Sequence, residues 1–485
     1  MIQGTASSVG KSFLVAGLCR VYARRGLRVA PFKAQNMSLN SAVTGGGAEI
    51  SRSQAVQAEA AGIAAMVEMN PVLLKPESDQ RSQLICMGKV VGTLASEDFG
   101  QWRPRLWEQV RSALECLRGQ FDLVLIEGAG SPAEVNLRST DMVNMRVAAE
   151  AQAPVLLASS IERGGVFAAL LGTLDLLGPQ DRGRIRGILI NRFRGDPQLF
   201  ADGVGFIERK ASLPILGIIP DIQVRLPAED SLELGHLRSP AGDMLDIAVI
   251  LCDRISNFDE LEPLSAEPGV GLRLVRGAGE LGVPDLIIMP GSKMTATDLE
   301  SLRRSGLADA IRAARSAGSA VIGICAGYQM LGRQICDPGA LEQQGTFPGL
   351  GLLEVSTTFA SPKVTRLRQG TVLSRTGLLA GVAGVKVSGY EIRMGRVGGD
   401  EVAAALDLGD CREGAVSADG WVVGTSVHGL FRCQSFRRGL LEALAVRKGV
   451  ALPPAELGSD PFEVIADALE QSLNMEAIDQ LAGLA

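Results

Sequence analysis

The sequence has few of the residues that build common metal centres. Its 485 residues include only two histidines, His236 and His428, and eight cysteines, none of which forms a CxxC pair. Zinc and iron–sulfur centres need closely spaced cysteine or histidine ligands, so we expect neither kind of centre. The cysteines are instead expected to be small buried side chains in a reducing compartment.

Long apolar runs and basic patches are also missing. No apolar run approaches the roughly 18 residues that a transmembrane helix needs, and we see no signal peptide. The net charge is −6, without the clustered lysines and arginines typical of nucleic-acid binding. The sequence therefore predicts a cytoplasmic enzyme with a small-molecule substrate, no nucleic-acid partner and no membrane span.

What is present favours an α/β protein of more than one domain. Aromatic residues make up only 4% of the chain, whereas glycine occurs 58 times, which suits many tight strand-to-helix turns. Short apolar runs alternate with helical patterns, which predicts mainly parallel sheets covered on both faces. The turn-rich stretch around 235–243 separates two such series. We expect domains at 1–235 and 246–440, a linker at 236–245 and a helical segment at 441–485.

A phosphate-binding loop is predicted at the start of the chain. Residues 4–12 read GTASSVGKS and precede a helical pattern that continues to Arg25. Backbone N–H groups at such a helix N-terminus bind phosphate, Lys11 is expected to contact the β and γ oxygens of ATP, and the Ser12 hydroxyl to ligate Mg²⁺. The alternative is an ordinary turn before a helix. The expected loop residues are Gly4, Thr5, Ser7, Ser8, Val9, Gly10, Lys11 and Ser12.

Two downstream residues belong to the same hypothesis. Glu127 ends the apolar run 123–126, where a carboxylate can hold Mg²⁺ opposite the loop, although such residues also cap turns. The loop resembles that of dethiobiotin synthetase, and this resemblance implies that Lys33 bridges an activated carboxylate and the γ-phosphate. Its alternative is a solvated lysine at a strand end.

A second site is predicted where residues 320–332 read AVIGICAGYQMLG. A strand followed by G-x-C-x-G and a helix is the arrangement that exposes a nucleophile on a sharp turn. The helix N-terminus favours the thiolate of Cys325. We expect the oxyanion and substrate-binding residues of this site to be Gly291, Ser292, Ala326 and Gln329.

A cysteine nucleophile needs a base, and the sequence offers two histidines. His236 lies in the expected linker, whereas His428 follows the apolar run 422–427. We therefore expect Cys325 and His428 to be catalytic. The alternatives are a buried structural cysteine and a core histidine.

The chain as a whole resembles the cobyric acid synthase family. The segments that carry the resemblance include KAQNMSLN (33–40), NRFRGD (191–196), GYEIRMG (389–395) and VHGLF (427–431). The resemblance covers nearly the whole chain. It implies a P-loop, dethiobiotin-synthetase-like parallel sheet followed by a class I glutamine amidotransferase-like domain. One departure concerns Leu430, because related triad enzymes have an acidic residue two positions after the histidine, so what orients His428 stays open.

The resemblance also implies the reaction. The family amidates the b, d, e and g carboxylates of adenosylcobyrinic acid a,c-diamide, using one glutamine and one ATP with Mg²⁺ for each. ATP would form an acyl phosphate, and ammonia released at Cys325 would attack it. Cobalt would enter only within the corrinoid substrate, and a homodimer is one open possibility. The expected substrate-binding residues are Asn36, Asn40, Asp141, Arg163 and Arg192.

The sequence also allows other interpretations. Asp141 could instead cap a helix, and the arginines could form surface ion pairs. Cobyrinic acid a,c-diamide synthase has the same overall plan, and the lipid II amidotransfer complex is a second relative. A P-loop switch protein with an inactive amidotransferase domain is a different class. Measurable glutamine hydrolysis that is lost in Cys325→Ser would exclude it.

Overall fold

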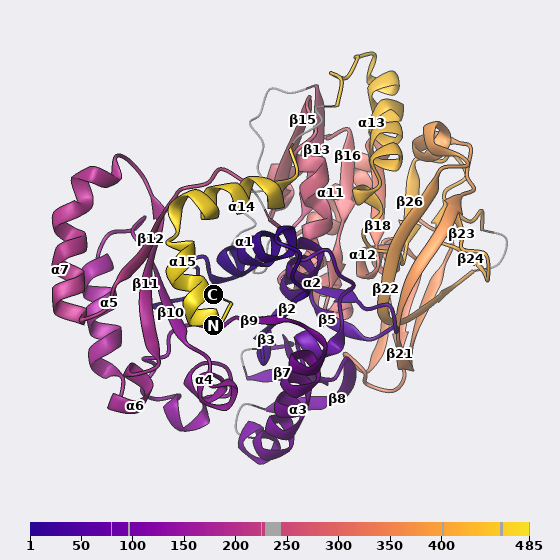
Figure 1. The fold of residues 1–485 in the computed structure, drawn as a ribbon. Helices are drawn as coiled ribbons and strands as arrows, with labels where there is room; N and C mark the ends of the chain where they lie inside the picture. Colours follow the sequence, from indigo (N-terminus) through magenta and orange to yellow (C-terminus); the bar gives the residue numbers. More distant parts are fainter. Residues whose placement is uncertain are drawn as a thin grey trace. The chain divides into compact units, whose positions relative to one another are not determined.

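The computed structural model describes residues 1–485 except 79, 96–97, 225, 228–243, 400–401, 456–458 and 485. Most of the expected linker, with His236, therefore lies outside the described residues. The chain divides into two compact units, which Figure 1 colours along the sequence. Unit 1 comprises residues 1–37, 50–227 and 458–485, and unit 2 comprises 38–49 and 228–457. Within the described residues, no helix has the length and apolar character required to span a membrane.

Unit 1 is built on parallel strands (Figure 1). They are β1 (Ile2–Gly4), β2 (Val29–Phe32), β9 (Leu123–Ile126), β10 (Val155–Ser160), β11 (Ile185–Phe193) and β12 (Ile215–Pro220). Four of them pair in the order β1-β10-β11-β12, and β2 pairs with β9. A parallel bridge between Ile2 and Glu127 joins the end of β9 to β1. All these strands therefore present their carboxyl ends at one edge, where ligands bind in such sheets.

The helices of unit 1 follow the strands. They are α1 (Lys11–Arg24), α2 (Arg52–Ala60), α3 (Phe99–Gln120), α4 (Met145–Ala151), α5 (Val166–Leu176), α6 (Pro179–Arg182), α7 (Ala201–Ala211), α14 (Pro461–Ser472) and α15 (Met475–Ala482). Buried apolar side chains of α1, β10, β11 and α14 form one core. A second core lies between α5, α7 and the sheet.

Unit 1 also contains a small mixed sheet. The strands β3 (Gln35–Met37), β6 (Val72–Pro76), β7 (Arg81–Cys86) and β8 (Lys89–Ala95) pair in that order. Strand β3 pairs with β6 in parallel, and the remaining pairs are antiparallel. The apolar pattern of the sequence does not predict this sheet. Its strands are short, and β8 is largely exposed, so it shows little apolar alternation.

Unit 2 contains a second, mainly parallel sheet. Its order is β15 (Val270–Val275), β13 (Leu245–Ile250), β16 (Leu286–Met289), β18 (Ala320–Ile324), β26 (Val422–Thr425) and β25 (Ala415–Val416), with only the last strand antiparallel. The helices of unit 2 are α8 (Glu262–Ser265), α9 (Ala278–Leu281), α10 (Thr295–Arg304), α11 (Leu307–Ser316), α12 (Ala326–Leu331) and α13 (Gln434–Lys448). With unit 1, this arrangement confirms the expected fold class of two successive α/β units.

The rest of unit 2 is rich in strands. They are β19 (Gln334–Asp337), β20 (Gly345–Pro348), β21 (Ser356–Val372), β22 (Lys386–Gly398), β23 (Leu406–Asp407) and β24 (Arg412–Glu413). The long antiparallel pair β21–β22 dominates this sheet. Strands β14 (Ile255–Ser256) and β17 (Gly291–Ser292) form a small antiparallel pair. In the chain, β17 follows β16, and η5 (Phe258–Leu261) follows β14.

The units do not coincide with the expected boundaries. The expected C-terminal segment 441–485 is divided, because α13 belongs to unit 2 whereas α14 and α15 belong to unit 1. Residues 38–49, which include β4 (Ser41–Val43), lie early in the chain but group with unit 2. The helical pattern at 294–317 forms two helices, since Gly306 takes a positive φ of 74° between them.

Gly17 lets α14 pack closely on α1. A Cβ atom at Gly17 would clash with the side chains of Ile465 and Leu469, which are both fully buried. We expect Gly17→Val to lower the free energy of unfolding of unit 1 by about 1–3 kcal/mol, because it overpacks this contact. Denaturant unfolding followed by circular dichroism measures the change. Gly172→Val in α5 is the matched control, because a Cβ there meets nothing. Equal stability of the two variants would contradict this packing role.

Candidate functional site

The predicted phosphate loop connects β1 to α1. Thr5 is fixed to β10, since its N–H donates to the Ala158 carbonyl and its hydroxyl lies 2.8 Å from that of Ser159. The Lys11 ammonium donates to the carbonyls of Ala6 and Gly130 at 2.9 and 3.2 Å. The lysine therefore folds back over the loop, where it can meet a phosphate held by the N-terminus of α1.

Gly10 and Asn191 fix the shape of this loop. Gly10 precedes α1 with φ 95°, and a Cβ atom there would clash with the Asn191 side chain. The Asn191 amide donates to the Val9 carbonyl at 2.9 Å. Asn191 opens the segment NRFRGD, so the structure gives this residue a role in the loop that the sequence analysis missed.

Glu127 joins three side chains of the predicted nucleotide site. One carboxylate oxygen accepts from the Ser12 hydroxyl at 2.8 Å and from the Lys33 ammonium at 2.9 Å. The other accepts from Gln57 of α2 at 2.5 Å. Glu127 is fully buried and Lys33 nearly so. The structure thus brings Ser12, Lys33 and Glu127 together, as expected, and adds Gln57, which no motif indicated.

The expected substrate-binding residues are more dispersed. Asp141 accepts backbone N–H groups of residues 143, 144 and 146, before and within the first turn of α4. Arg192 forms an ion pair with Glu162 at 2.7 Å, and Arg163 is exposed. Asn36 donates to Ser51 and Gln54 in a buried network. Asn40 groups with unit 2.

Cys325 stands on a strained turn between β18 and α12. It has φ 53° and ψ −107°, a conformation that non-glycine residues rarely adopt. Gly327 permits the turn, because a Cβ atom there would clash with the Met289 carbonyl. The thiol lies 3.5 Å from the Ile392 carbonyl and is almost fully buried. The nucleophile elbow expected from the sequence is therefore present.

His428 is buried beside a carboxylate that the sequence did not reveal. Its Nδ1 atom is 2.9 Å from a Glu260 carboxylate oxygen, whose other oxygen accepts the Gly429 N–H at 2.9 Å. Glu260 hydrogen bonds to the ring, and the Cys325 thiol interacts with it electrostatically. Burial alone would lower the pKa of His428, but Glu260 and Cys325 raise it above its ordinary value. Cys325, His428 and Glu260 thus have the arrangement expected of a nucleophile, a base and an orienting carboxylate.

Tyr390 supports the histidine from β22. The two rings stack with centroids 5.3 Å apart and an interplanar angle of 19°. The backbones of these residues also exchange N–H···O bonds of 2.8 and 3.1 Å. The plane and position of the His428 ring are therefore fixed from its face as well as by Glu260.

The expected oxyanion and glutamine-binding residues surround this group unequally. Ala326 follows Cys325 at the start of α12, and a Cβ atom on Gly291 would lie 3.0 Å from the His428 ring. The Ser292 hydroxyl instead donates a hydrogen bond to Asp298 of α10 at 2.5 Å. Gln329 is buried, and its side-chain oxygen finds no hydrogen-bond donor among the described residues. Gln329 thus offers a buried acceptor near Cys325.

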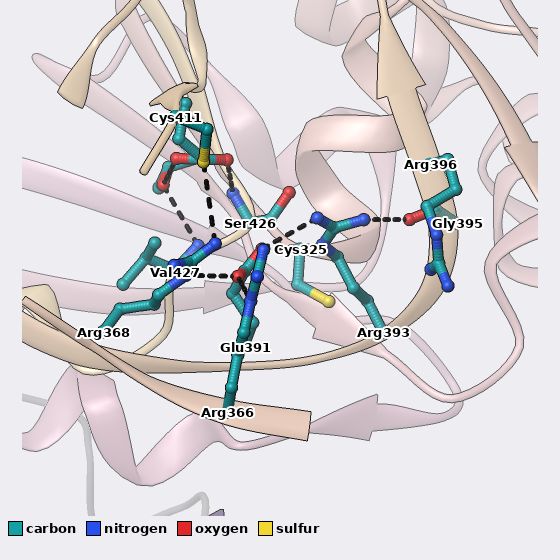
Figure 2. Close-up of polar contacts among 12 residues, drawn as sticks. Cys325, Arg366, Arg368, Glu391, Arg393, Gly395, Arg396, Cys411, Ser426 and Val427 are labelled. Atoms are coloured by element: carbon teal, nitrogen blue, oxygen red, sulfur yellow. Dashed lines mark hydrogen bonds and ion pairs between the residues drawn. The ribbon is translucent and has the colours of Figure 1, made fainter. Parts of the chain in front are cut away.

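Side chains of β21 and β22 form a buried ionic cluster. Glu391 precedes Ile392, whose carbonyl contacts Cys325, and is fully buried. Three guanidinium groups bind it, those of Arg366, Arg368 and Arg393. Figure 2 shows this cluster beside Cys325. Burial would raise the pKa of Glu391, but the arginines hold it below its usual value. The cluster fixes the strand that passes over the nucleophile.

Known proteins share both halves of this arrangement. Residues 1–233 match the CobQ/CobB/MinD/ParA nucleotide binding domain, and residues 246–436 match the CobB/CobQ-like glutamine amidotransferase domain. Relatives from Dehalococcoides mccartyi and Citrobacter koseri, both named cobyric acid synthase, are 46% identical over 99% of this chain and 97% of their own. One of the same name from Sorangium cellulosum is 47% identical over 100% of this chain and 98% of its own.

We expect Glu260→Gln to lower the pKa of His428, because the carboxylate that stabilises the imidazolium is lost. NMR titration of protein labelled at the histidine Cε1 carbon measures this directly, since the chain has only two histidines. The turnover of glutamine should fall by about two orders of magnitude or more. Glu262→Gln, two residues away on α8, is the control. An unchanged titration of His428 in Glu260→Gln would contradict the assignment.

Proposed function

Because the chain belongs to the cobyric acid synthase family, we propose that it is a glutamine-dependent amidoligase of cobalamin biosynthesis. The proposed substrate is adenosylcobyrinic acid a,c-diamide, whose b, d, e and g carboxylates become amides. The observation that carries the proposal is the Cys325–His428–Glu260 group in a chain that also has the phosphate loop. The full-length similarity to relatives of one name supports this substrate over that of the diamide synthase.

In the first half-reaction, glutamine loses its side-chain nitrogen. His428 takes the proton of the Cys325 thiol, and the thiolate attacks the carboxamide carbon. The negative oxygen that develops is stabilised by the Ala326 N–H and by the backbone of Gly291. His428 returns the proton to the departing ammonia, leaving a thioester that water hydrolyses. Glu260 keeps the ring oriented throughout.

In the second half-reaction, a corrinoid carboxylate is activated. A carboxylate oxygen attacks the γ-phosphorus of ATP, ADP leaves, and ammonia then displaces phosphate from the acyl phosphate. Lys11 and the N-terminus of α1 hold the phosphates, and Lys33 is placed to neutralise the charge between carboxylate and phosphate. Ser12 and Glu127 offer a hydroxyl and a carboxylate oxygen, a donor set that suits Mg²⁺ beside nucleotide phosphates. When bound, Mg²⁺ would supply charge neutralisation at the phosphates.

The test follows the corrinoid by mass spectrometry during incubation with adenosylcobyrinic acid a,c-diamide, ATP, Mg²⁺ and either glutamine or ammonium. We expect wild-type protein to amidate the remaining eligible carboxylates with either nitrogen source. Cys325→Ser should act only with ammonium, because the thioester cannot form. Lys33→Ala should lose amidation with both sources but retain glutamine hydrolysis, since its side chain serves the other half-reaction.

Other outcomes would reject parts of the proposal. Amidation of cobyrinic acid at a and c, without action on the diamide, would assign the chain to the diamide synthase reaction. Turnover of ATP and glutamine with neither corrinoid changed would retain the chemistry and reject the substrate. Ammonium-dependent amidation by Lys33→Ala at the wild-type rate would show that Lys33 does not help to activate the carboxylate.

A further inference from the structure

Residues 38–49, called here the inserted segment, belong to the N-terminal part of the chain but are anchored in unit 2. Val43 of β4 forms an apolar cluster with Tyr390 and Ile392 of β22. The buried carboxylate of Glu49 pairs with Lys363 of β21 at 2.5 Å. The segment therefore contacts the strand that carries Tyr390, whose ring stacks on His428.

The inserted segment also fixes an amide beside the base. The Ser41 backbone N–H donates to the Asn257 Oδ1 atom at 2.9 Å, and the Asn257 Nδ2 atom lies 3.4 Å from Nε2 of His428. Within the Asn257 side chain, only the amide oxygen can accept a hydrogen bond from an N–H group. The bond from Ser41 therefore determines which end of the Asn257 amide faces the histidine. The end that faces it is the NH₂ group.

This orientation affects the protonation of His428. Nδ1 is occupied by Glu260, so Nε2 is the ring nitrogen left to exchange a proton with Cys325 in the proposed mechanism. An NH₂ group can donate to the lone pair of neutral Nε2, but it opposes the N–H that Nε2 carries in the imidazolium. The other groups facing the ring are Glu260 from η5 and Cys325 from the β18–α12 turn, which favour the imidazolium, and the stacked Tyr390 ring from β22.

We propose that Asn257, oriented by the Ser41 backbone, is a positioning residue that opposes formation of the Cys325 thiolate–His428 imidazolium pair. The inserted segment then controls how readily the nucleophile is activated, since displacing Ser41 frees the amide to turn its oxygen toward Nε2. This inference rests on the proposed role of Cys325 and His428 in glutamine hydrolysis.

The chain on both sides of the inserted segment carries residues of the predicted nucleotide site. Lys33 precedes it and Gln57 of α2 follows it, and both bind the Glu127 carboxylate. Asn36 lies between Lys33 and the segment in a buried network. The backbone between Lys33 and Ser41 therefore connects the groups around Glu127 to the inserted segment.

The test measures the rate at which iodoacetamide modifies Cys325 as a function of pH, with the modified peptide identified by mass spectrometry. Asn257→Asp keeps an acceptor for Ser41 and presents an acceptor oxygen to Nε2. Ser41→Pro removes the N–H donor and frees the amide. Ser41→Ala is the control, because it keeps the N–H group. Circular dichroism and thermal unfolding verify that each variant is folded.

We expect Asn257→Asp and Ser41→Pro to be modified at Cys325 about threefold or more faster than wild type near pH 6.5, where a histidine normally titrates. Ser41→Ala should match the wild type. If folded Asn257→Asp shows the wild-type pH profile, or is modified more slowly, the proposal is wrong and Asn257 has only a structural role. The assay needs neither glutamine hydrolysis nor a corrinoid, so its outcome is separate from that of the proposed function.

Discussion

Both candidate sites depend on the same constraint, a parallel strand that passes into a helix through a turn too tight for most side chains. At the phosphate loop the turn needs Gly10, whose φ is positive and whose missing side chain leaves room for Asn191. At the elbow Cys325 itself takes the unusual conformation, and Gly327 allows the helix to approach Met289. In each case the helix N-terminus directs backbone N–H donors toward the site, where they can stabilise negative charge.

The side chains that surround the two turns suit them to different chemistry. Near the loop, a buried carboxylate, Glu127, gathers a hydroxyl and an ammonium group, which suits phosphate and magnesium chemistry. Near the elbow, Glu260 instead holds an imidazole beside a thiol, which suits acyl transfer. In the proposed mechanism, two similar strand-to-helix turns serve two different half-reactions because different side chains surround them.

The turns were predictable from the sequence because their residues are contiguous. The loop 4–12 and the elbow 323–327 each place the glycines and the reactive side chain within one short motif, and the apolar runs beside them predicted the strands. Glu260 was not predictable, because it lies far from His428 in sequence and the position usually acidic holds Leu430. The placements of α14 and of residues 38–49 depend on tertiary packing, namely on Gly17 and on Tyr390, which no local pattern records.

The claim that joins the two half-reactions is that nitrogen from glutamine becomes the corrinoid amide. Its most direct measurement uses glutamine labelled with ¹⁵N at the side-chain amide, together with unlabelled ammonium, ATP, Mg²⁺ and adenosylcobyrinic acid a,c-diamide. We expect the newly formed amides to carry ¹⁵N in wild type and unlabelled nitrogen in Cys325→Ser. Unlabelled amides in the wild-type product, despite hydrolysis of the glutamine, would contradict the transfer.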